Sequence, residues 1–198
     1  NGYLQMITAI AFQDTTIMRR FASDEVFEKV RPFMEGQQVL YNRIYLNSVE
    51  LIGVYDKGRK YELAFAVKSS YQRVAYQEGA KPQLLDPSVF SEVEVILMSR
   101  DKGSSASAHS LYAHACPNCG GPVEDTLNTD CVYCGSVLNS TSHEWIVTGW
   151  LDMNEYRGYK DENKKAATFT VDPGLLEGLY DVRDFAFNNV MVMIAADG

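Results

Sequence analysis

The fold of this chain is decided by residues 49–71, which run V-E-L-I-G-V-Y-D-K-G-R-K-Y-E-L-A-F-A-V-K-S-S-Y. Apolar residues alternate with polar or small ones on both sides of Asp56-Lys57-Gly58, a tripeptide with the chemistry of a tight turn. A period of two is typical of a half-buried strand. We therefore predict two long antiparallel strands over residues 49–76, joined by a hairpin.

Two helices are predicted upstream of this hairpin. Apolar residues recur at intervals of three and four between Leu4 and Phe21, which indicates a helix with one buried face. Ser23 interrupts the pattern and supplies an N-cap hydroxyl for a second, shorter helix. The strand alternation that follows is irregular near Asn47-Ser48, where we expect a bulge.

Downstream, the sequence predicts a further strand pair with an insertion at its tip. Residues 89–100 alternate as a strand, and the pattern returns over 143–151. Pairing these runs makes the segment between them an elaborate hairpin insertion. The polar stretch 154–171 is expected to be a connector. Asp172-Pro173, an N-cap before a first-turn proline, predicts a C-terminal helix over 172–198.

The insertion holds all the cysteines, arranged as two C-x-x-C-G motifs: Cys116, Cys119, Cys131 and Cys134. Each motif places two sulfurs on a tight turn, and its glycine allows the backbone to fold beneath a metal with its amides facing the thiolates. We expect the four cysteines to hold one structural Zn²⁺, with iron in the same ligand set or redox-active thiols as alternatives. Four protein ligands leave no position to activate water.

Three histidines flank the cysteines: His109, His114 and His143. His114 precedes the first cysteine by two residues, so it could replace a ligand or donate a hydrogen bond to a sulfur. Because four cysteines already complete a tetrahedral site, we favour a surface imidazole.

Composition and charge exclude several classes of function. The chain has 198 residues, 46% of them hydrophobic, and a net charge of −8, which is ordinary globular composition without a membrane-spanning run. Residues 103–156 hold no Lys or Arg but six Asp or Glu. Phosphate binding requires several cations, so we expect no nucleic-acid partner.

The sequence contains no catalytic motif. It has neither G-x-S-x-G nor H-E-x-x-H, and every cysteine belongs to the metal set. Four acidic residues are expected on solvated hairpin faces: Asp56, Glu62, Glu92 and Glu94. We therefore expect no enzymatic activity.

The order of these parts resembles bacterial Tim-forty-four-like domains, relatives of the C-terminal domain of the mitochondrial inner-membrane import subunit. The resemblance covers residues 1–153 and lies in the helix linker I-M-R-R-F-A-S-D (17–24) and in two C-x-x-C-G motifs followed by Glu144-Trp145. It implies an α+β fold, a nuclear-transport-factor-two-like (cystatin-like) cone of N-terminal helices on a bent antiparallel sheet. Residues 1–102 and 143–153 would form the cone, with a zinc ribbon inserted at 111–140.

The resemblance also implies a binding or scaffolding role for a cytoplasmic bacterial protein. Its partner would be a protein segment or a hydrophobic ligand, received in the cone or against the ribbon. Because the wider fold hosts enzymes, a small-molecule-binding or catalytic pocket in the cone is the alternative. The sequence has no basic amphipathic helix, so the charge does not support peripheral membrane association, which would use segments outside this chain.

The C-terminal run N-V-M-V-M-I-A-A-D-G, residues 189–198, resembles the start of a TerB-like tellurite-resistance module. In that module an acidic continuation follows. The similarity implies that the natural protein couples the cone and ribbon to a helical, sensor-like module.

Overall fold

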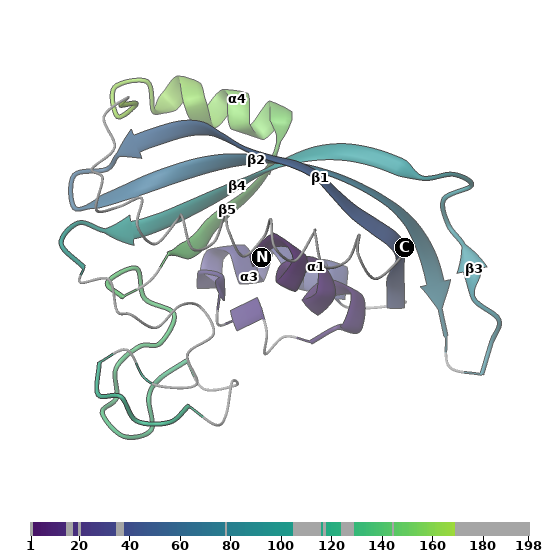
Figure 1. Ribbon diagram of the computed structural model, residues 1–198, viewed down its shortest axis with the longest axis horizontal. Coiled ribbons are helices and arrows are strands. Elements are labelled where there is room, and N and C mark those ends of the chain that lie inside the picture. Colours follow the sequence, from purple (N-terminus) through teal and green to yellow (C-terminus); the bar gives the residue numbers. More distant parts are fainter. Residues whose placement is uncertain are drawn as a thin grey trace, which may run out of the picture.

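The computed structural model describes residues 2–14, 18–19, 21–34, 38–77, 79–104, 116, 118–123, 129–143 and 145–168. The predicted C-terminal helix over 172–198, His109 and His114 lie outside them. The described part is an α+β structure in which an antiparallel sheet arches over two helices and carries a third on its outer face (Figure 1). In chain order its elements are α1 (Gly2–Phe12), α3 (Asp24–Met34), β1 (Gln38–Asp56), β2 (Lys60–Tyr76), β3 (Gln83–Leu84), β4 (Phe90–Asp101), β5 (Ile146–Asp152) and α4 (Met153–Glu162).

The sheet has the order β1-β2-β4-β5, and the short β3 pairs with β2. The predicted hairpin is confirmed: β1 and β2 pair from Gln38↔Tyr76 to Asp56↔Tyr61. Three register shifts interrupt the pairing along β1, one of them between Leu46 and Ser48, where the sequence predicts a bulge. Bulges bend a strand and increase its twist. They are consistent with the pronounced curvature of the two long strands in Figure 1.

The concave face carries the larger hydrophobic core. Helices α1 and α3 contribute Met6, Ala9 and Val26, which pack against Val67 on β2 and Ile96 on β4. Fully burying one aliphatic side chain of this size contributes about 1.5–3 kcal/mol, so this face supplies much of the drive to fold.

The first helix is shorter than the sequence predicts. The apolar spacing extends to Phe21, yet α1 ends at Phe12 and the next residue, Gln13, has a φ of 57°. A left-handed residue stops helix propagation, so a single helix to Phe21 was a wrong prediction. The start of α3 is as predicted, because the Ser23 hydroxyl accepts a hydrogen bond from the Val26 amide at 3.4 Å.

Within the expected connector over 154–171, the residues up to Glu162 are helical and belong to α4. Helix α4 begins with a capping box: Asp152 Oδ1 accepts from the Glu155 amide at 2.8 Å, and Glu155 Oε2 accepts from the Asp152 amide at 2.8 Å. Tyr156 is buried against Tyr55 on the convex face. No helix among the described residues is long and apolar enough to cross a membrane.

Candidate metal centre

The cysteine insertion, residues 111–140, leaves and rejoins the sheet at the tip of the β4–β5 hairpin (Figure 1). These strands pair from Glu94↔Asp152 to Ser99↔Ile146, as the sequence predicts. Two hydrogen bonds then close the base of the insertion. The Asp101 amide donates to the Thr141 carbonyl at 2.8 Å, and the Thr141 hydroxyl donates to Asp101 Oδ1 at 2.8 Å.

The two C-x-x-C-G motifs adopt the same backbone structure. In each, the amide of the first cysteine donates to the carbonyl five residues later, and the amide four residues later donates to the carbonyl of that cysteine. The bonds are 2.7–2.9 Å long and join Cys116 to Gly121 and Gly120, and Cys131 to Ser136 and Gly135. Gly120 and Gly135 have φ of 71° and 69°, which only glycine adopts without strain. The tight turn predicted for each motif is confirmed.

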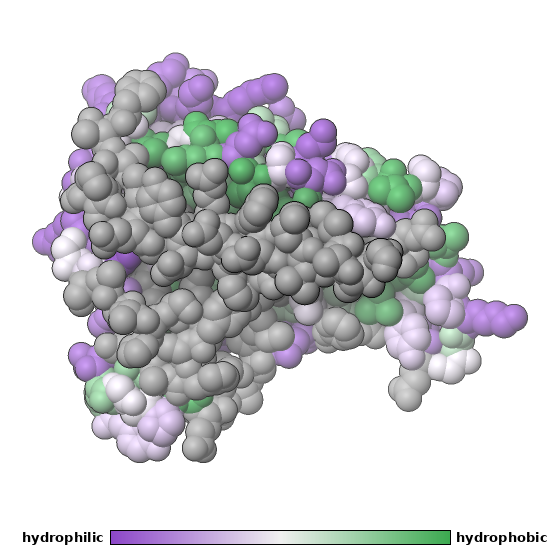
Figure 2. Space-filling view, viewed as in Figure 1, coloured by the Kyte–Doolittle hydropathy of each residue, from purple (hydrophilic) through white to green (hydrophobic). Residues whose placement is uncertain are grey.

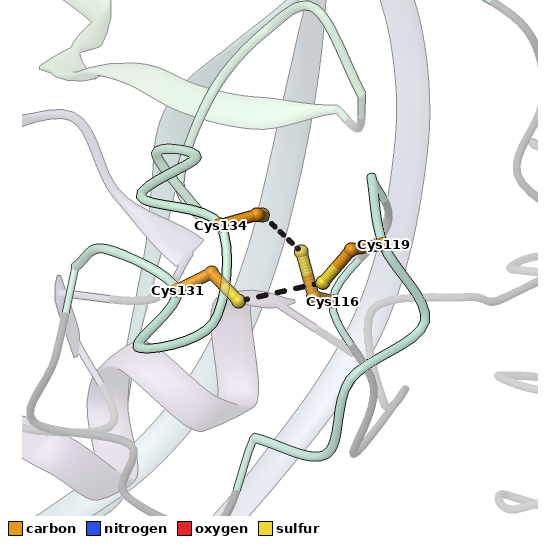
Figure 3. Close-up of side chains that lie close together, drawn as sticks. All are labelled: Cys116, Cys119, Cys131 and Cys134. Atoms are coloured by element: carbon orange, nitrogen blue, oxygen red, sulfur yellow. Dashed lines mark hydrogen bonds between the residues drawn. The ribbon is translucent and has the colours of Figure 1, made fainter.

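This repeated geometry brings the four sulfurs together (Figure 3). All four lie within 4.8 Å of one another, and two pairs, Cys116–Cys134 and Cys119–Cys131, are 3.7 Å apart. Four sulfurs at about 2.3 Å from a tetrahedral metal would be separated by about 3.8 Å. The cysteines are free thiols, and each short contact joins one motif to the other. The cluster therefore has the dimensions of a four-coordinate metal site.

Backbone and side-chain donors surround the sulfurs. The Asn118 amide donates to Cys116 Sγ and the Gly121 amide to Cys119 Sγ, both at 3.4 Å. The Asn118 side chain donates to Cys134 Sγ at 3.6 Å. Such N–H···S contacts orient thiolate ligands and offset their negative charge.

As free thiols, the cysteines differ in acidity. A hydrogen bond with the Ser136 hydroxyl, together with bonds from the Ser136 amide and the Asn118 side chain, lowers the pKa of Cys134 to about 6. For Cys119 the Gly121 amide acts to lower the pKa, but the Cys134 thiol, burial and the remaining thiols raise it to about 12. Thiolates this close repel one another, so all four ionise together only around a cation.

The insertion has a small core of its own. Val123 and Leu138 are buried against Cys116 and Cys131, whereas Cys119 and Cys134 are exposed. The Tyr133 ring packs on the other motif so closely that a Cβ on Gly121 would lie 2.7 Å from it. His143 does not belong to the group of residues that could hold a metal within the described ranges.

One contact ties the insertion to the N-terminal region. The Asn139 side chain donates to the Arg19 carbonyl at 3.2 Å. Arg19 lies beside the buried Met18, a member of the concave core. The insertion therefore rests on the segment between α1 and α3 as well as on the hairpin that carries it.

Outside the insertion, the structure corrects the prediction that the strand carboxylates are solvated. Glu62 is buried beneath α4, where it accepts hydrogen bonds from Ser99 Oγ at 3.0 Å, from Thr148 Oγ1 at 3.3 Å and from the Tyr159 hydroxyl. Lys57 Nζ lies 3.9 Å from its carboxylate. The alternation along β2 places Glu62 on the polar face of the strand. It does not predict that α4 covers this face.

Glu94, on the concave face, also departs from the prediction of a solvated carboxylate. Its Oε2 accepts from the Tyr3 hydroxyl at 2.7 Å, and its Oε1 accepts from Trp150 Nε1 at 2.6 Å. Burial is the main cause that raises its pKa. Glu92 also has a side-chain partner, since the Tyr71 hydroxyl donates to its Oε1 at 2.5 Å, whereas Asp56 is exposed as expected.

Comparison of the chain with models of protein families, with curated proteins and with solved structures finds no match in any of the three. The chemistry assigned to this chain therefore rests on its own residues. The clearest evidence is the group of four sulfurs, which can bind one metal ion.

Proposed function

We propose that this protein is a non-enzymatic binding module: a Tim-forty-four-like cone that carries a structural zinc ribbon and engages a protein segment or a hydrophobic ligand. The observation that carries the proposal is the closed set of four sulfurs, two pairs of which are 3.7 Å apart. A tetrahedral zinc site with four thiolates has no position for water or substrate. Zinc held there would shape a surface and take no part in a reaction.

Zinc is the metal that this donor set favours. Four thiolates at tetrahedral spacing suit Zn²⁺ or an iron of the same coordination, whereas Mg²⁺ and Ca²⁺ prefer oxygen ligands. Cys116 and Cys131 are buried against aliphatic side chains, as in a site whose metal completes a small core. The curved sheet with helices on its concave face supports the nuclear-transport-factor-two-like assignment of the surrounding cone.

The exposed surface of the insertion supports a binding role. The insertion exposes three large hydrophobic side chains that lie close together in the sequence: Val132, Tyr133 and Val137. With Zn²⁺ bound, four thiolates would add about two negative charges to a region that already lacks Lys and Arg. An apolar surface in an acidic setting suits a protein segment that combines apolar and basic residues.

Metal analysis with limited proteolysis tests the zinc ribbon. We expect about one zinc ion per chain, and chelation should expose 111–140 to protease while β1, β2 and β4 stay protected. Protection of 111–140 that survives chelation would contradict the proposal, as would iron in place of zinc.

Selection from a random peptide library on the zinc-loaded protein tests the binding role. The enriched peptides should combine apolar and basic residues, and the V132S/Y133S variant should not retain them. The matched control is Val89→Ser, which changes an exposed apolar residue just before β4, at the opposite end of that strand from the insertion. If V132S/Y133S binds the enriched peptides as well as the wild type does, the peptides bind at another surface.

The second candidate function is a small-molecule or catalytic pocket in the cone, and Glu94 is the observation that favours it. A desolvated carboxylate beside a tyrosine and a tryptophan is a group that pocket enzymes use. Both oxygens of Glu94 already accept hydrogen bonds from side chains of this chain, which favours a structural role. Thermal-shift screening of metabolites on the wild type and on Glu94→Gln distinguishes a ligand-binding pocket from a structural role of Glu94, because a pocket ligand would stabilise only the wild type.

A further inference from the structure

The four cysteines of the insertion differ in their access to solvent. The second cysteine of each motif is exposed and the first is buried: Cys119 and Cys134 are exposed, Cys116 and Cys131 are buried. Each of the two 3.7 Å contacts joins an exposed cysteine to the buried cysteine of the other motif (Figure 3). Each exposed sulfur therefore has a second sulfur directly beside it. Cysteines that respond to oxidants have this arrangement, an accessible sulfur next to a resolving one.

The two exposed sulfurs also differ in their hydrogen bonds. Among the described residues, Cys119 Sγ accepts from one N–H donor, the Gly121 amide at 3.4 Å. Cys134 Sγ accepts from the Asn118 side chain at 3.6 Å and forms a hydrogen bond with the Ser136 hydroxyl at 3.2 Å, and the Ser136 amide adds a third bond. Such bonds draw negative charge from a thiolate and make it a weaker nucleophile. Cys119 is therefore the exposed sulfur that we expect to react first.

We propose that the metal site is also a peroxide-sensitive switch, in which oxidation joins Cys119 to Cys131, then Cys116 to Cys134, and releases the zinc. This inference rests on the zinc site proposed above and adds a way to regulate it. The oxidant is a peroxide, which is small enough to reach the exposed sulfurs.

Each disulfide consumes one molecule of peroxide. The Cys119 thiolate attacks one oxygen of hydrogen peroxide, the O–O bond breaks, and the sulfur becomes a sulfenic acid while hydroxide leaves. The Cys131 thiolate then attacks the sulfenic sulfur, and a second hydroxide leaves as the S–S bond forms. The two sulfurs together lose two electrons to the peroxide, and the two hydroxides take up protons from solvent to become water. A disulfide lacks the negative charge of the thiolates that hold Zn²⁺, so the metal leaves.

This pairing keeps the insertion closed after the zinc has left. Both disulfides connect one motif to the other, across 12 and 18 residues, so they replace the link that the metal supplied and restrict the unfolded chain. Disulfides within a motif would join cysteines three residues apart and leave the motifs unconnected. Figure 2 shows mainly hydrophobic and weakly polar surface on the described part of the insertion, at the lower left. Oxidation therefore keeps this surface but removes the roughly two negative charges of the zinc-bound thiolates.

Oxidation of the full zinc-loaded chain with limiting hydrogen peroxide tests the switch. A colorimetric chelator follows zinc release, and mass spectrometry of unreduced peptides identifies each disulfide. We expect about one zinc ion to leave per chain, with Cys119–Cys131 formed before Cys116–Cys134. Dithiothreitol with added zinc should restore the loaded protein. Residues 129–140 should stay protected from protease after oxidation, whereas chelation of the reduced protein should expose them.

The outcomes separate the switch from the function on which it rests. Zinc that stays bound in excess peroxide, or disulfides within the motifs, would overturn the switch and leave the structural zinc site intact. A reduced protein that binds no zinc would contradict the zinc site itself, and the switch with it.

Asn118→Ala tests the order of oxidation. It removes a side-chain donor to Cys134 Sγ, so the share of Cys116–Cys134 among the first disulfides should rise about threefold. The matched control is Asn139→Ala, which changes another asparagine of the insertion whose side chain donates to the Arg19 carbonyl. It should leave the order unchanged. Equal shares in N118A and N139A would overturn the order that we propose.

Discussion

Arg73 and Asp86 form a two-pronged ion pair that fixes the loop after β2 to the end of that strand. Arg73 Nε donates to Asp86 Oδ2 and Arg73 Nη2 donates to Oδ1, each at 2.9 Å, and the Arg73 backbone amide adds a third bond to Oδ2 at 2.9 Å. The loop also carries the exposed Leu84 and Leu85. A planar guanidinium matches a carboxylate in this geometry, which makes the pair specific as well as attractive.

This pair predicts a stability change at acidic pH. Side-chain hydrogen bonds from Arg73, followed by its backbone amide, lower the pKa of Asp86 from 3.8 to about 2. A carboxyl whose pKa is lower in the folded state stabilises the protein above its unfolded pKa and loses that effect as the pH falls. Wild type should therefore be more stable than Asp86→Asn by a constant amount above about pH 5, and the difference should shrink between pH 4 and pH 2. Urea unfolding across this range measures it. A difference that stays constant down to pH 2 would contradict the assignment.

Glu94 predicts the opposite pH dependence. Burial raises the pKa of Glu94 above its ordinary value of 4.5, so ionisation is less favourable in the folded state than in the unfolded chain. The neutral form of Glu94 therefore stabilises the folded protein fully below pH 4.5. This stabilisation is lost as the pH rises through the pKa that Glu94 has in the folded state. Relative to Glu94→Gln, the wild type should lose stability over that interval, and urea unfolding between pH 4 and pH 8 measures the loss.

The same variant removes a hydrogen-bond acceptor at neutral pH. The amide of a glutamine offers one oxygen where Glu94 offers two, so the Tyr3 hydroxyl or Trp150 Nε1 would lose its acceptor. Leaving one buried donor unpaired costs about 1–3 kcal/mol. Glu50→Gln, an exposed position on β1, is the control and should change the free energy of unfolding little. Equal stability of E94Q and E50Q would show that these two bonds contribute nothing.

The glycines of the two C-x-x-C-G motifs should control metal affinity. Alanine in the left-handed region costs about 1–2 kcal/mol per site, so Gly120→Ala and Gly135→Ala should each weaken zinc binding about 5- to 30-fold in competition with a chelator. Gly103→Ala is the matched control, because Gly103 has a φ of 77° but lies outside the insertion. It should lower stability without changing zinc affinity, and equal zinc affinity in all three variants would contradict the prediction.

Gly53 should control the docking of α4. A Cβ at this position would lie 2.7 Å from Tyr156 Oη and 2.9 Å from the Tyr55 ring, so Gly53→Ala should destabilise the protein by about 1–3 kcal/mol. Tyr156→Phe removes the nearer atom, and the double variant G53A/Y156F should recover part of the loss. Gly158→Ala, in open space on α4, should instead stabilise by up to about 1 kcal/mol. Thermal unfolding followed by circular dichroism compares them.

The features that the sequence predicts correctly are those encoded by neighbouring residues. The β1–β2 hairpin follows from alternation and one turn, and the shape of each cysteine motif follows from its glycine. The pairing of Cys116 with Cys134 across the motifs is a consequence of two such turns facing each other. Neither the strand alternation nor the glycine turns depend on distant residues, whereas the approach of the two cysteine turns does.

The features that the sequence misses depend on distant partners. Glu94 receives its hydrogen bonds from residues 91 and 56 positions away, and Glu62 receives one from Tyr159, 97 positions away. Nothing near either glutamate in the sequence predicts such partners. Helix α4 did have local signals: Asp152 and Glu155 are spaced as a capping box, and Met153, Tyr156 and Tyr159 recur every three residues and pack on the convex face.

The hydrogen bonds between Asp101 and Thr141 have an evolutionary consequence. Since the chain leaves and re-enters the sheet at adjacent points, a lineage can gain, lose or exchange everything between them without shifting the register of β4 against β5. Among the described residues, the Asn139 contact to Arg19 would have to be replaced. The cysteine insertion is thus a portable unit, which can diversify while the scaffold beneath it stays the same.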